Sequence, residues 1–177
     1  LPTDDAFRMR PEALAGALAE ELGDAARPGE QAVPAGAAAA ERACTPIAVC
    51  ASAGATNTGA VDPLPELAEI CREAGVWLHV DAAYGGFAAL TERGRSALEG
   101  MELADSLTLD PHKWLFQPYE AGCLLVRDVG RLEDAFRILP EYLQDAELGL
   151  EHVNFADRGV QLTRAFRALK VWMSVRT

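Results

Sequence analysis

Two ionisable residues stand in apolar surroundings, where a charge is stable only with a suitable partner. Asp81 closes the run Trp-Leu-His-Val-Asp, and Lys113 follows a histidine between a proline and a tryptophan. A carboxylate in such a place needs a cation or several hydrogen-bond donors. A desolvated lysine is a nucleophile that condenses with aldehydes, and cofactor chemistry pairs that amine with an acid at a pyridine nitrogen. The two residues together predict a site for an aldehyde cofactor.

Each of the two residues also has a simpler interpretation. Asp81 is placed to cap the turn over residues 82–86, and a single lysine in a loop is most often a solvated surface residue. Taken alone, Asp81 supports the capping and the cofactor interpretations about equally. The cofactor interpretation is favoured because Lys113 supplies the second group that it requires.

The remaining polar residues indicate no other kind of site. His79, His112 and His152 lack the spacing of a metal site, so we expect no metal. The glycine-rich segments 54–59 and 85–86 match neither phosphate-binding loop pattern, and no serine lies in a nucleophile elbow. His79 shares a strand face with Asp81 by alternation, where it is either packed or hydrogen-bonded behind the carboxylate.

A strand, a helix and a second strand must position these groups. The apolar run 46–52 predicts a buried strand, a helix follows from Asp62 to Gly75, and residues 76–80 predict a second strand. Such a unit favours parallel strands, whose ligands lie beyond the carboxyl ends. Thr56 and Asp81 both fall at that edge.

Further elements complete an α/β pattern with no internal repeat. Residues 106–109 and 122–126 predict strands, and residues 11–22 and 130–136 predict helices. A last amphipathic helix is expected from Val160 to Arg176, with its apolar face open to a partner. The Ala- and Pro-rich stretch 25–45 cannot supply much burial and predicts a flexible loop.

Composition excludes several classes of partner. The 177 residues carry a formal net charge of -11, which repels nucleic acid and anionic membrane surfaces. The uncharged run 43–61 is interrupted too often by proline, glycine and polar residues for a membrane helix, and no signal peptide is recognised. Four cysteines without paired spacing favour a soluble protein of the reducing cytoplasm.

Two segments carry a resemblance to a known family. The sequences His-Val-Asp-Ala-Ala-Tyr-Gly-Gly at 79–86 and Asp-Pro-His-Lys-Trp at 110–114 together resemble the group II pyridoxal-phosphate decarboxylases, the family of aromatic-amino-acid and glutamate decarboxylases. The resemblance runs from about Thr3 to the C-terminus, apart from the loop 25–45. It implies an α/β fold: residues 1–177 would be part of the large domain of a fold-type I, aspartate aminotransferase-like enzyme, a mostly parallel sheet flanked by helices.

The resemblance also implies roles for individual residues around pyridoxal 5'-phosphate. Lys113 would form the Schiff base, and Asp81 would hold the pyridine nitrogen. Four further positions would contact the cofactor: Ala83 against the ring, His112 beside the phosphate, Thr56 near the ring, and Asp110 next to the phosphate-side histidine.

Tyr142 distinguishes two outcomes that the resemblance allows. It falls where decarboxylating members carry a tyrosine that returns a proton to the substrate carbon. By the same resemblance, related aldehyde synthases have phenylalanine at this position. Decarboxylation of an L-amino acid, with aromatic ones favoured, is therefore expected, and an aldehyde synthase is the alternative.

The length of the chain gives a further expectation. Family members are far longer, so we expect a fragment or one subunit of a split enzyme. A homodimer or a complementing chain would supply the rest of the site. A non-catalytic or incomplete subunit that serves as a binding partner is the alternative of another class.

Overall fold

The computed structural model describes residues 1–23, 45–137 and 153–176. The chain divides into two compact units, Leu1–Leu125 and Val126–Thr177. Of the sequence-based predictions, the loop 25–44, Tyr142 and His152 lie outside the described residues. Among the described helices, none is long and apolar enough to cross a membrane.

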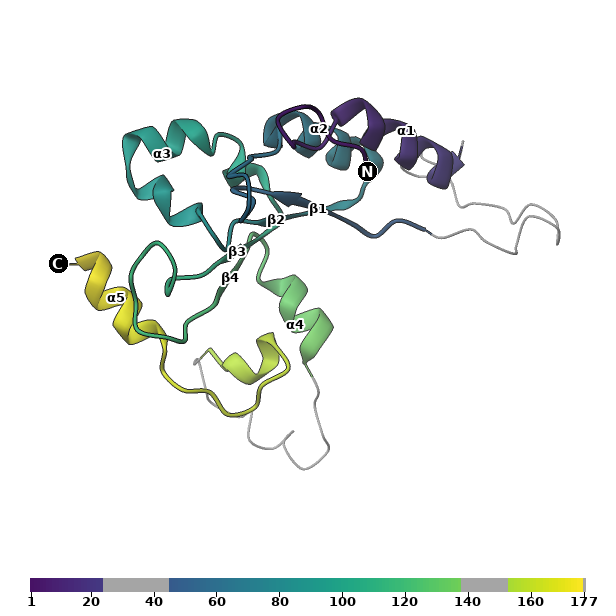
Figure 1. The fold of residues 1–177 in the computed structure, drawn as a ribbon. Helices are drawn as coiled ribbons and strands as arrows, with labels where there is room; N and C mark the ends of the chain where they lie inside the picture. Colours follow the sequence, from purple (N-terminus) through teal and green to yellow (C-terminus); the bar gives the residue numbers. More distant parts are fainter. Residues whose placement is uncertain (24–44, 138–152, 177) are drawn as a thin grey trace. The chain divides into compact units, whose positions relative to one another are not determined.

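The larger unit alternates strands and helices as predicted. Its elements, coloured purple to green in Figure 1, are α1 (Pro11–Leu22), β1 (Ala48–Ser52), α2 (Leu64–Ala74), β2 (Trp77–Asp81), the 3-10 helix η2 (Gly86–Leu90), α3 (Glu92–Ala97), the 3-10 helix η3 (Met101–Leu103), β3 (Ser106–Leu109) and β4 (Cys123–Val126), whose last residue belongs to the second unit.

The strands form one sheet in the order β1-β2-β3-β4. The first three strands are parallel, and their register aligns Ser52 with Asp81 and Asp81 with Thr108. Three carboxyl ends therefore meet at one edge of the sheet, which confirms the predicted parallel arrangement.

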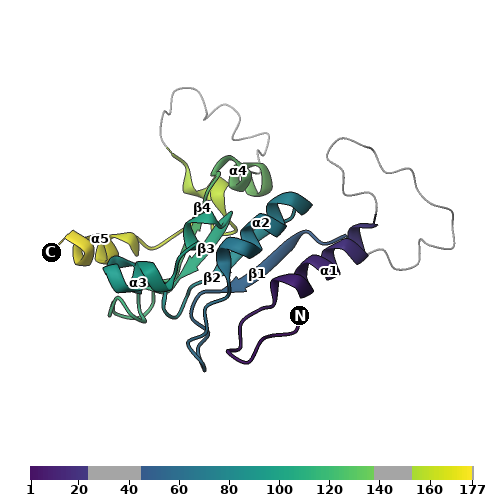
Figure 2. The ribbon, with the colours of Figure 1, turned by 90° about the horizontal axis from the view of Figure 1, so that it is seen from above.

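One face of the sheet is covered by α1 and α2, which run along it side by side (Figures 1 and 2). In β2, Leu78 and Val80 point into this core and are almost fully buried. The helices contribute leucines at helical spacing, which are buried against the strands: Leu14, Leu18, Leu64 and Leu67. Burying each of these side chains stabilises the unit by about 2 kcal/mol.

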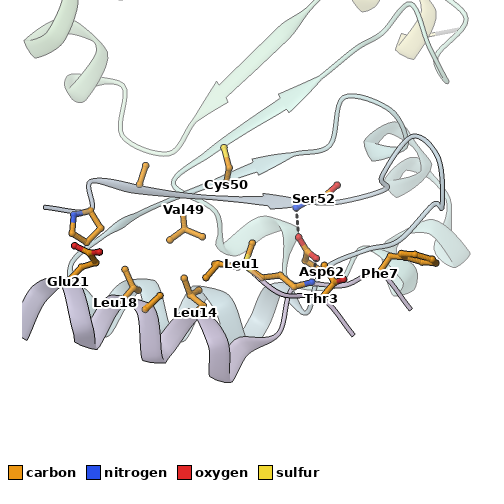
Figure 3. Close-up of a pocket in the computed structure, with 14 residues that line it drawn as sticks. Leu1, Thr3, Phe7, Leu14, Leu18, Glu21, Val49, Cys50, Ser52 and Asp62 are labelled. Carbon is orange, nitrogen blue, oxygen red and sulfur yellow. Dashed lines mark hydrogen bonds between the residues drawn. The ribbon is translucent and has the colours of Figure 1, made fainter. Parts of the chain in front are cut away.

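The opposite face of the sheet is polar and less buried. Trp77, His79 and Asp81 alternate with the core residues of β2 and so face away from α1 and α2. Cys50, in register with His79, is exposed, and its side chain points away from α1 in Figure 3. The candidate carboxylate thus belongs to the polar face.

A buried carboxylate ties the N-terminal segment to the sheet. The two oxygens of Asp62 accept the backbone N–H groups of Met9, at 2.6 Å, and Ser52, at 2.7 Å (Figure 3). Asp62 is only 8% exposed, so removing it would leave both donors without a partner in a region that water barely reaches.

We expect Asp62→Ala to lower the free energy of unfolding by about 2–4 kcal/mol, since two hydrogen bonds to a charged acceptor are lost. Urea unfolding followed by circular dichroism measures this change. Glu69→Ala, on the exposed side of α2, is the control and should change stability by less than about 0.5 kcal/mol. Equal stability of the two variants would contradict the structural role of Asp62.

The second unit corrects the prediction for the C-terminal region. It contains α4 (Gly130–Phe136), as predicted, a 3-10 helix η5 (Phe155–Arg158) and α5 (Ala168–Arg176). The predicted helix from Val160 is therefore wrong over residues 160–167. The apolar side chains of this stretch, such as Leu162 and Phe166, are exposed in the described part of the chain, so helical spacing there lacks the packing from which most helical stability in proteins comes. The prediction is confirmed over residues 168–176, which form α5.

The short helix α3 was missed by the sequence analysis. Its signal is local, because the hydroxyl of Thr91 accepts the N–H of Gly94 at 3.0 Å and so caps the first turn. Threonine before the charged pair Glu92 and Arg93 was the available clue.

Candidate active site

The two family-like segments meet at the carboxyl edge of the sheet. Beyond the strands, Ala82 donates its N–H to the carbonyl of Thr108 at 3.0 Å, and Asp110 donates to the carbonyl of Ala83 at 3.3 Å. The rings of Tyr84 and Trp114 then pack edge to face, with centroids 5.6 Å apart. The segment after Asp81 and the segment before Lys113 therefore lie side by side.

Glycines allow the loops at this edge to approach closely. Gly54, after β1, has φ of +102°, and a Cβ built on it would lie 3.5 Å from the backbone nitrogen of Gly85. A Cβ on Gly86 would collide with the side chain of Leu109 and lie 2.7 Å from the Cβ of Ala82. Gly86 is thus required by packing of the turn after β2 against β3, whereas a Cβ on Gly85 would meet only the carbonyl oxygen of Ala53, at 3.9 Å.

Asp81 is exposed at the end of β2, so it is not the buried carboxylate that its apolar strand predicted. Its Oδ1 accepts the N–H of Ala83 at 3.0 Å, which confirms the simpler interpretation that it caps the turn. The cap uses one oxygen, and a carboxylate has acceptor capacity for further donors. Capping the turn and holding a ring nitrogen are therefore compatible.

Lys113 is partly exposed and paired, rather than desolvated as expected. Its Nζ lies 2.8 Å from Oδ2 of Asp110, and the two side chains are 36% and 20% exposed. The pair closes a turn in which Lys113 also donates its backbone N–H to the carbonyl of Asp110 at 2.9 Å. Asp110 therefore fixes the direction of the amine.

The ring of His112 is oriented by its neighbours. Nδ1 lies 2.7 Å from the carbonyl oxygen of Ala121, which requires this nitrogen to donate a proton, and the backbone nitrogen of Ala121 is 3.3 Å away from it. We assign the proton to Nδ1 because the shorter contact is to an obligate acceptor. Tyr119 packs edge to face on the ring, and Nε2 is left 3.9 Å from Oδ2 of Asp110.

The other predicted positions are placed as follows. Ala83 is half-buried in the turn after β2, where it contacts Asp81 through its backbone. Thr56 is exposed in the loop after β1, the same loop whose Gly54 approaches Gly85. The structure therefore brings the segments of Asp81, Ala83, Asp110, His112 and Lys113 together and places Thr56 on the neighbouring loop.

Sequence analysis missed two polar residues on β3. Ser106 and Thr108 occupy alternate positions in the strand, in register with His79 and Asp81, and both hydrogen-bond to His79. Period-two alternation of hydroxyl and leucine side chains in Ser-Leu-Thr-Leu was the signal that could have identified them.

A cavity of about 480 Å³ lies between α1 and β1, on the other side of the sheet (Figure 3). Leu14, Leu18 and Val49 line it, and Asp62 is committed to two backbone donors. None of the candidate site residues borders this cavity. The chemistry therefore belongs to the carboxyl edge of the sheet and not to this apolar hollow.

Two cysteines are unsuited to nucleophilic work. Burial raises the pKa of the Cys71 thiol to about 11, with a smaller contribution from the charge of Asp105. Burial also raises the pKa of Cys123. In the part of the chain that the structure describes, no group of three or more His, Cys, Asp or Glu residues is arranged to hold a metal ion.

An amine, a carboxylate and an imidazole on adjoining loops at the carboxyl edge of a parallel sheet define a cofactor-binding α/β domain. The conserved domain of the pyridoxal-dependent decarboxylases matches residues 30–177. The chain belongs to this family, which confirms the resemblance carried by residues 79–86 and 110–114.

Individual relatives agree with the family. An aromatic-L-amino-acid decarboxylase of Bacillus atrophaeus is 55% identical over 130 residues, 73% of this chain and 27% of its own length. A phenylacetaldehyde synthase of a Rosa hybrid cultivar is 39% identical over 138 residues, 77% of this chain and 27% of its own.

A solved structure confirms the predicted fold class. The tryptophan decarboxylase of Catharanthus roseus in complex with L-tryptophan superposes with a TM-score of 0.77 and 35% identity, over 99% of this chain and 33% of that one. The chain spans about a quarter of the length of the curated relatives named above.

Proposed function

We propose that this chain is the cofactor-anchoring part of a pyridoxal-phosphate-dependent decarboxylase, which converts an L-amino acid to its amine and carbon dioxide. The observation that carries the proposal is the side-by-side packing of the Asp81 and Lys113 segments at one sheet edge. Membership of the pyridoxal-dependent decarboxylase family supports it independently.

The residues at this edge fit the chemical groups of pyridoxal phosphate. Lys113 offers an amine for the aldehyde, and Asp81 offers a carboxylate for the ring nitrogen with one oxygen already anchored on Ala83. His112 turns Nε2 away from its backbone contact and can donate to a phosphate when that nitrogen carries a proton. Ala83 and Thr56 would contact the ring.

Each residue has a physical task in the reaction. When bound, the cofactor would supply a ring that accepts the electron pair left on the substrate α-carbon as carbon dioxide departs. Asp81 would hold a proton on the ring nitrogen, because a carboxylate stabilises a neighbouring cation. Asp110 positions the amine of Lys113 through the 2.8 Å contact.

Aromatic L-amino acids are the proposed substrates. Support comes from the 55% identical relative, an aromatic-L-amino-acid decarboxylase, and from the neighbour structure in complex with L-tryptophan. An assay of amine and carbon dioxide release over a panel of aromatic, acidic and imidazole amino acids tests the proposal in the cofactor-loaded protein. We expect the aromatic amino acids to give the fastest release of amine and carbon dioxide. Release from none of the amino acids would contradict the proposed decarboxylase activity.

Tyr142 is proposed to return a proton from its hydroxyl to the substrate α-carbon. In air we expect Tyr142→Phe to divert product from amine to aldehyde, because an unprotonated α-carbon can be oxidised by dioxygen, which is reduced to peroxide while the amino nitrogen leaves as ammonia. The amine share should fall about tenfold or more, since a positioned acid contributes 10²–10⁴-fold. Chromatography of both products measures the ratio. An unchanged ratio would show that another group delivers the proton.

An aldehyde synthase is the second candidate, because a phenylacetaldehyde synthase is among the relatives. The tyrosine at position 142 favours the decarboxylase. Aldehyde as the main product of the unmodified protein would decide for the synthase.

A second chain is proposed to complete the site, either as a homodimer or as a complementing subunit. Exposed aromatic side chains flank Lys113, namely Trp114, Phe116 and Tyr119, and such a group is typical of an interface.

A cytoplasmic location is proposed from the acidic charge and the free cysteines Cys50, Cys71 and Cys123. A non-catalytic subunit remains the alternative of another class, and failure to bind cofactor with any partner present would favour it.

A further inference from the structure

A row of hydrogen bonds crosses β2 and β3 on the polar face of the sheet. The indole Nε1 of Trp77 donates to Oγ of Ser106 at 2.8 Å. The same Oγ lies 2.8 Å from Nδ1 of His79, and Nε2 of that ring lies 3.1 Å from Oγ1 of Thr108. Four side chains are thus connected in a single line.

This row ends beside Asp81. The register of the two parallel strands places His79 opposite Ser106 and Asp81 opposite Thr108. Residues opposite one another in a sheet project to the same face, with Cβ atoms about 5 Å apart. The residue at the end of the row is therefore the neighbour of Asp81 on the adjacent strand, although no hydrogen bond joins these two side chains among the described contacts.

Counting protons along the row assigns the tautomer of His79. An indole nitrogen can only donate, so Ser106 accepts from it. Ser106 is 8% exposed, and besides the indole its hydroxyl contacts only Nδ1 of His79 among the described hydrogen bonds, so we assign its one proton to this contact. Nε2 must then carry the ring proton and donate it to Thr108. The Thr108 hydroxyl keeps its own proton for a further acceptor.

We infer that His79 is a positioning residue, which keeps the hydroxyl proton of Thr108 available for donation to the neighbouring Asp81 carboxylate. Asp81 already accepts from Ala83 through Oδ1, and a second donor on the sheet side would fix the plane of the carboxylate. The inference rests on the proposed function, in which that carboxylate faces the cofactor nitrogen. The opposite tautomer would turn the Thr108 hydroxyl back toward the ring and remove the effect.

The tautomer can be read without cofactor or substrate. Protein labelled with ¹⁵N in histidine is expected to show the Nε2–H form of His79, assigned by comparison with a His79→Gln sample. In Ser106→Ala, which removes the proton donor to Nδ1, the Nδ1–H form should gain population. A ring that carries its proton on Nδ1 in the unmodified protein would overturn the inference.

A double-mutant cycle tests whether His79 acts through Thr108. Pyridoxal phosphate is titrated into cofactor-free protein, and its dissociation constant is read from absorbance. Thr108→Val and His79→Phe should each weaken cofactor binding about tenfold. The double variant should also lose about tenfold rather than a hundredfold, because both substitutions remove the same donation from Thr108 to Asp81. His79→Gln, whose amide can donate in place of Nε2, should recover most of the affinity. Additive losses, or none, would overturn the inference.

Two further variants separate this result from the proposed function. Cys50→Ala removes an exposed side chain opposite His79 on β1, outside the row, and should leave the affinity within about twofold. Asp81→Asn should weaken binding more than either row variant. If Asp81→Asn weakens binding while the cycle is additive, His79 has no positioning role and the proposed function stands. If Asp81→Asn binds cofactor normally, the proposed role of Asp81 fails, and the inference fails with it. Circular dichroism of each variant confirms that it is folded.

Discussion

Lys113→Ala is expected to abolish the absorbance of the Schiff base with pyridoxal phosphate and to lower turnover by roughly a thousandfold or more, because no other group can replace a covalent amine. The chain contains two lysines, Lys113 and Lys170, which makes the assignment unusually simple to check. Reduction of the loaded protein with borohydride, followed by peptide mass spectrometry, should find the label on Lys113. Label on Lys170 instead would contradict the proposed site.

The controls for this prediction separate chemistry from charge. Lys113→Arg keeps a cation beside Asp110 and so preserves the ion pair of the turn, yet a guanidinium does not form the covalent bond. It should be folded and inactive. Lys170→Ala, on α5, should bind cofactor as the unmodified protein does. Activity in Lys113→Arg would show that the lysine is only a structural partner of Asp110.

The second large effect concerns Asp81. Asp81→Asn should keep the cap on Ala83, since an amide oxygen still accepts, but it removes the charge that we propose keeps the cofactor nitrogen protonated. We expect turnover to fall roughly a hundredfold, equivalent to about 3 kcal/mol, with little change in thermal stability. Steady-state assays and thermal unfolding of the same sample measure both quantities.

A matched carboxylate lies at the other end of the sheet. Asp105 precedes β3, and its Oδ2 accepts the N–H of Leu78 at 2.8 Å, as Asp81 accepts that of Ala83. Asp105→Asn removes a charge from a similar backbone contact outside the site and should leave turnover unchanged. Equal losses in the two variants would mean that charge at position 81 has no special role.

Much of the fold could be predicted because residues that are buried on one face of a helix or strand recur at regular spacing in the sequence. The bounds of β3 and α4 were predicted to the residue, and α1 and α2 to within a residue or two, since leucines at helical spacing end at Gly23 and Gly75. The helix predicted from Val160 to Arg176 is confirmed from Ala168 on, and its first eight residues were predicted wrongly for the complementary reason. An apolar stripe identifies a face that could be buried, but it does not supply the surface that buries it.

The candidate site shows a different limit. Motif identity placed the Asp81 and Lys113 segments at one edge, and the parallel register confirms that placement. Burial of single side chains was predicted poorly, because strand-end residues such as Asp81 emerge into solvent although their neighbours are apolar. The ion pair of Lys113 with Asp110 depends on the local turn, which spacing alone does not reveal.

The contact between Asp110 and Lys113 has a consequence for how the protein loads its cofactor. The amine of Lys113 is already paired with the carboxylate of Asp110, so it must leave this ion pair before it can react with the aldehyde of the cofactor. Loading takes the amine out of this ion pair, and the Asp110 carboxylate then keeps Nε2 of His112, 3.9 Å from its Oδ2, as a neighbour. Apoprotein and holoprotein should therefore differ in the ionic contacts of this turn.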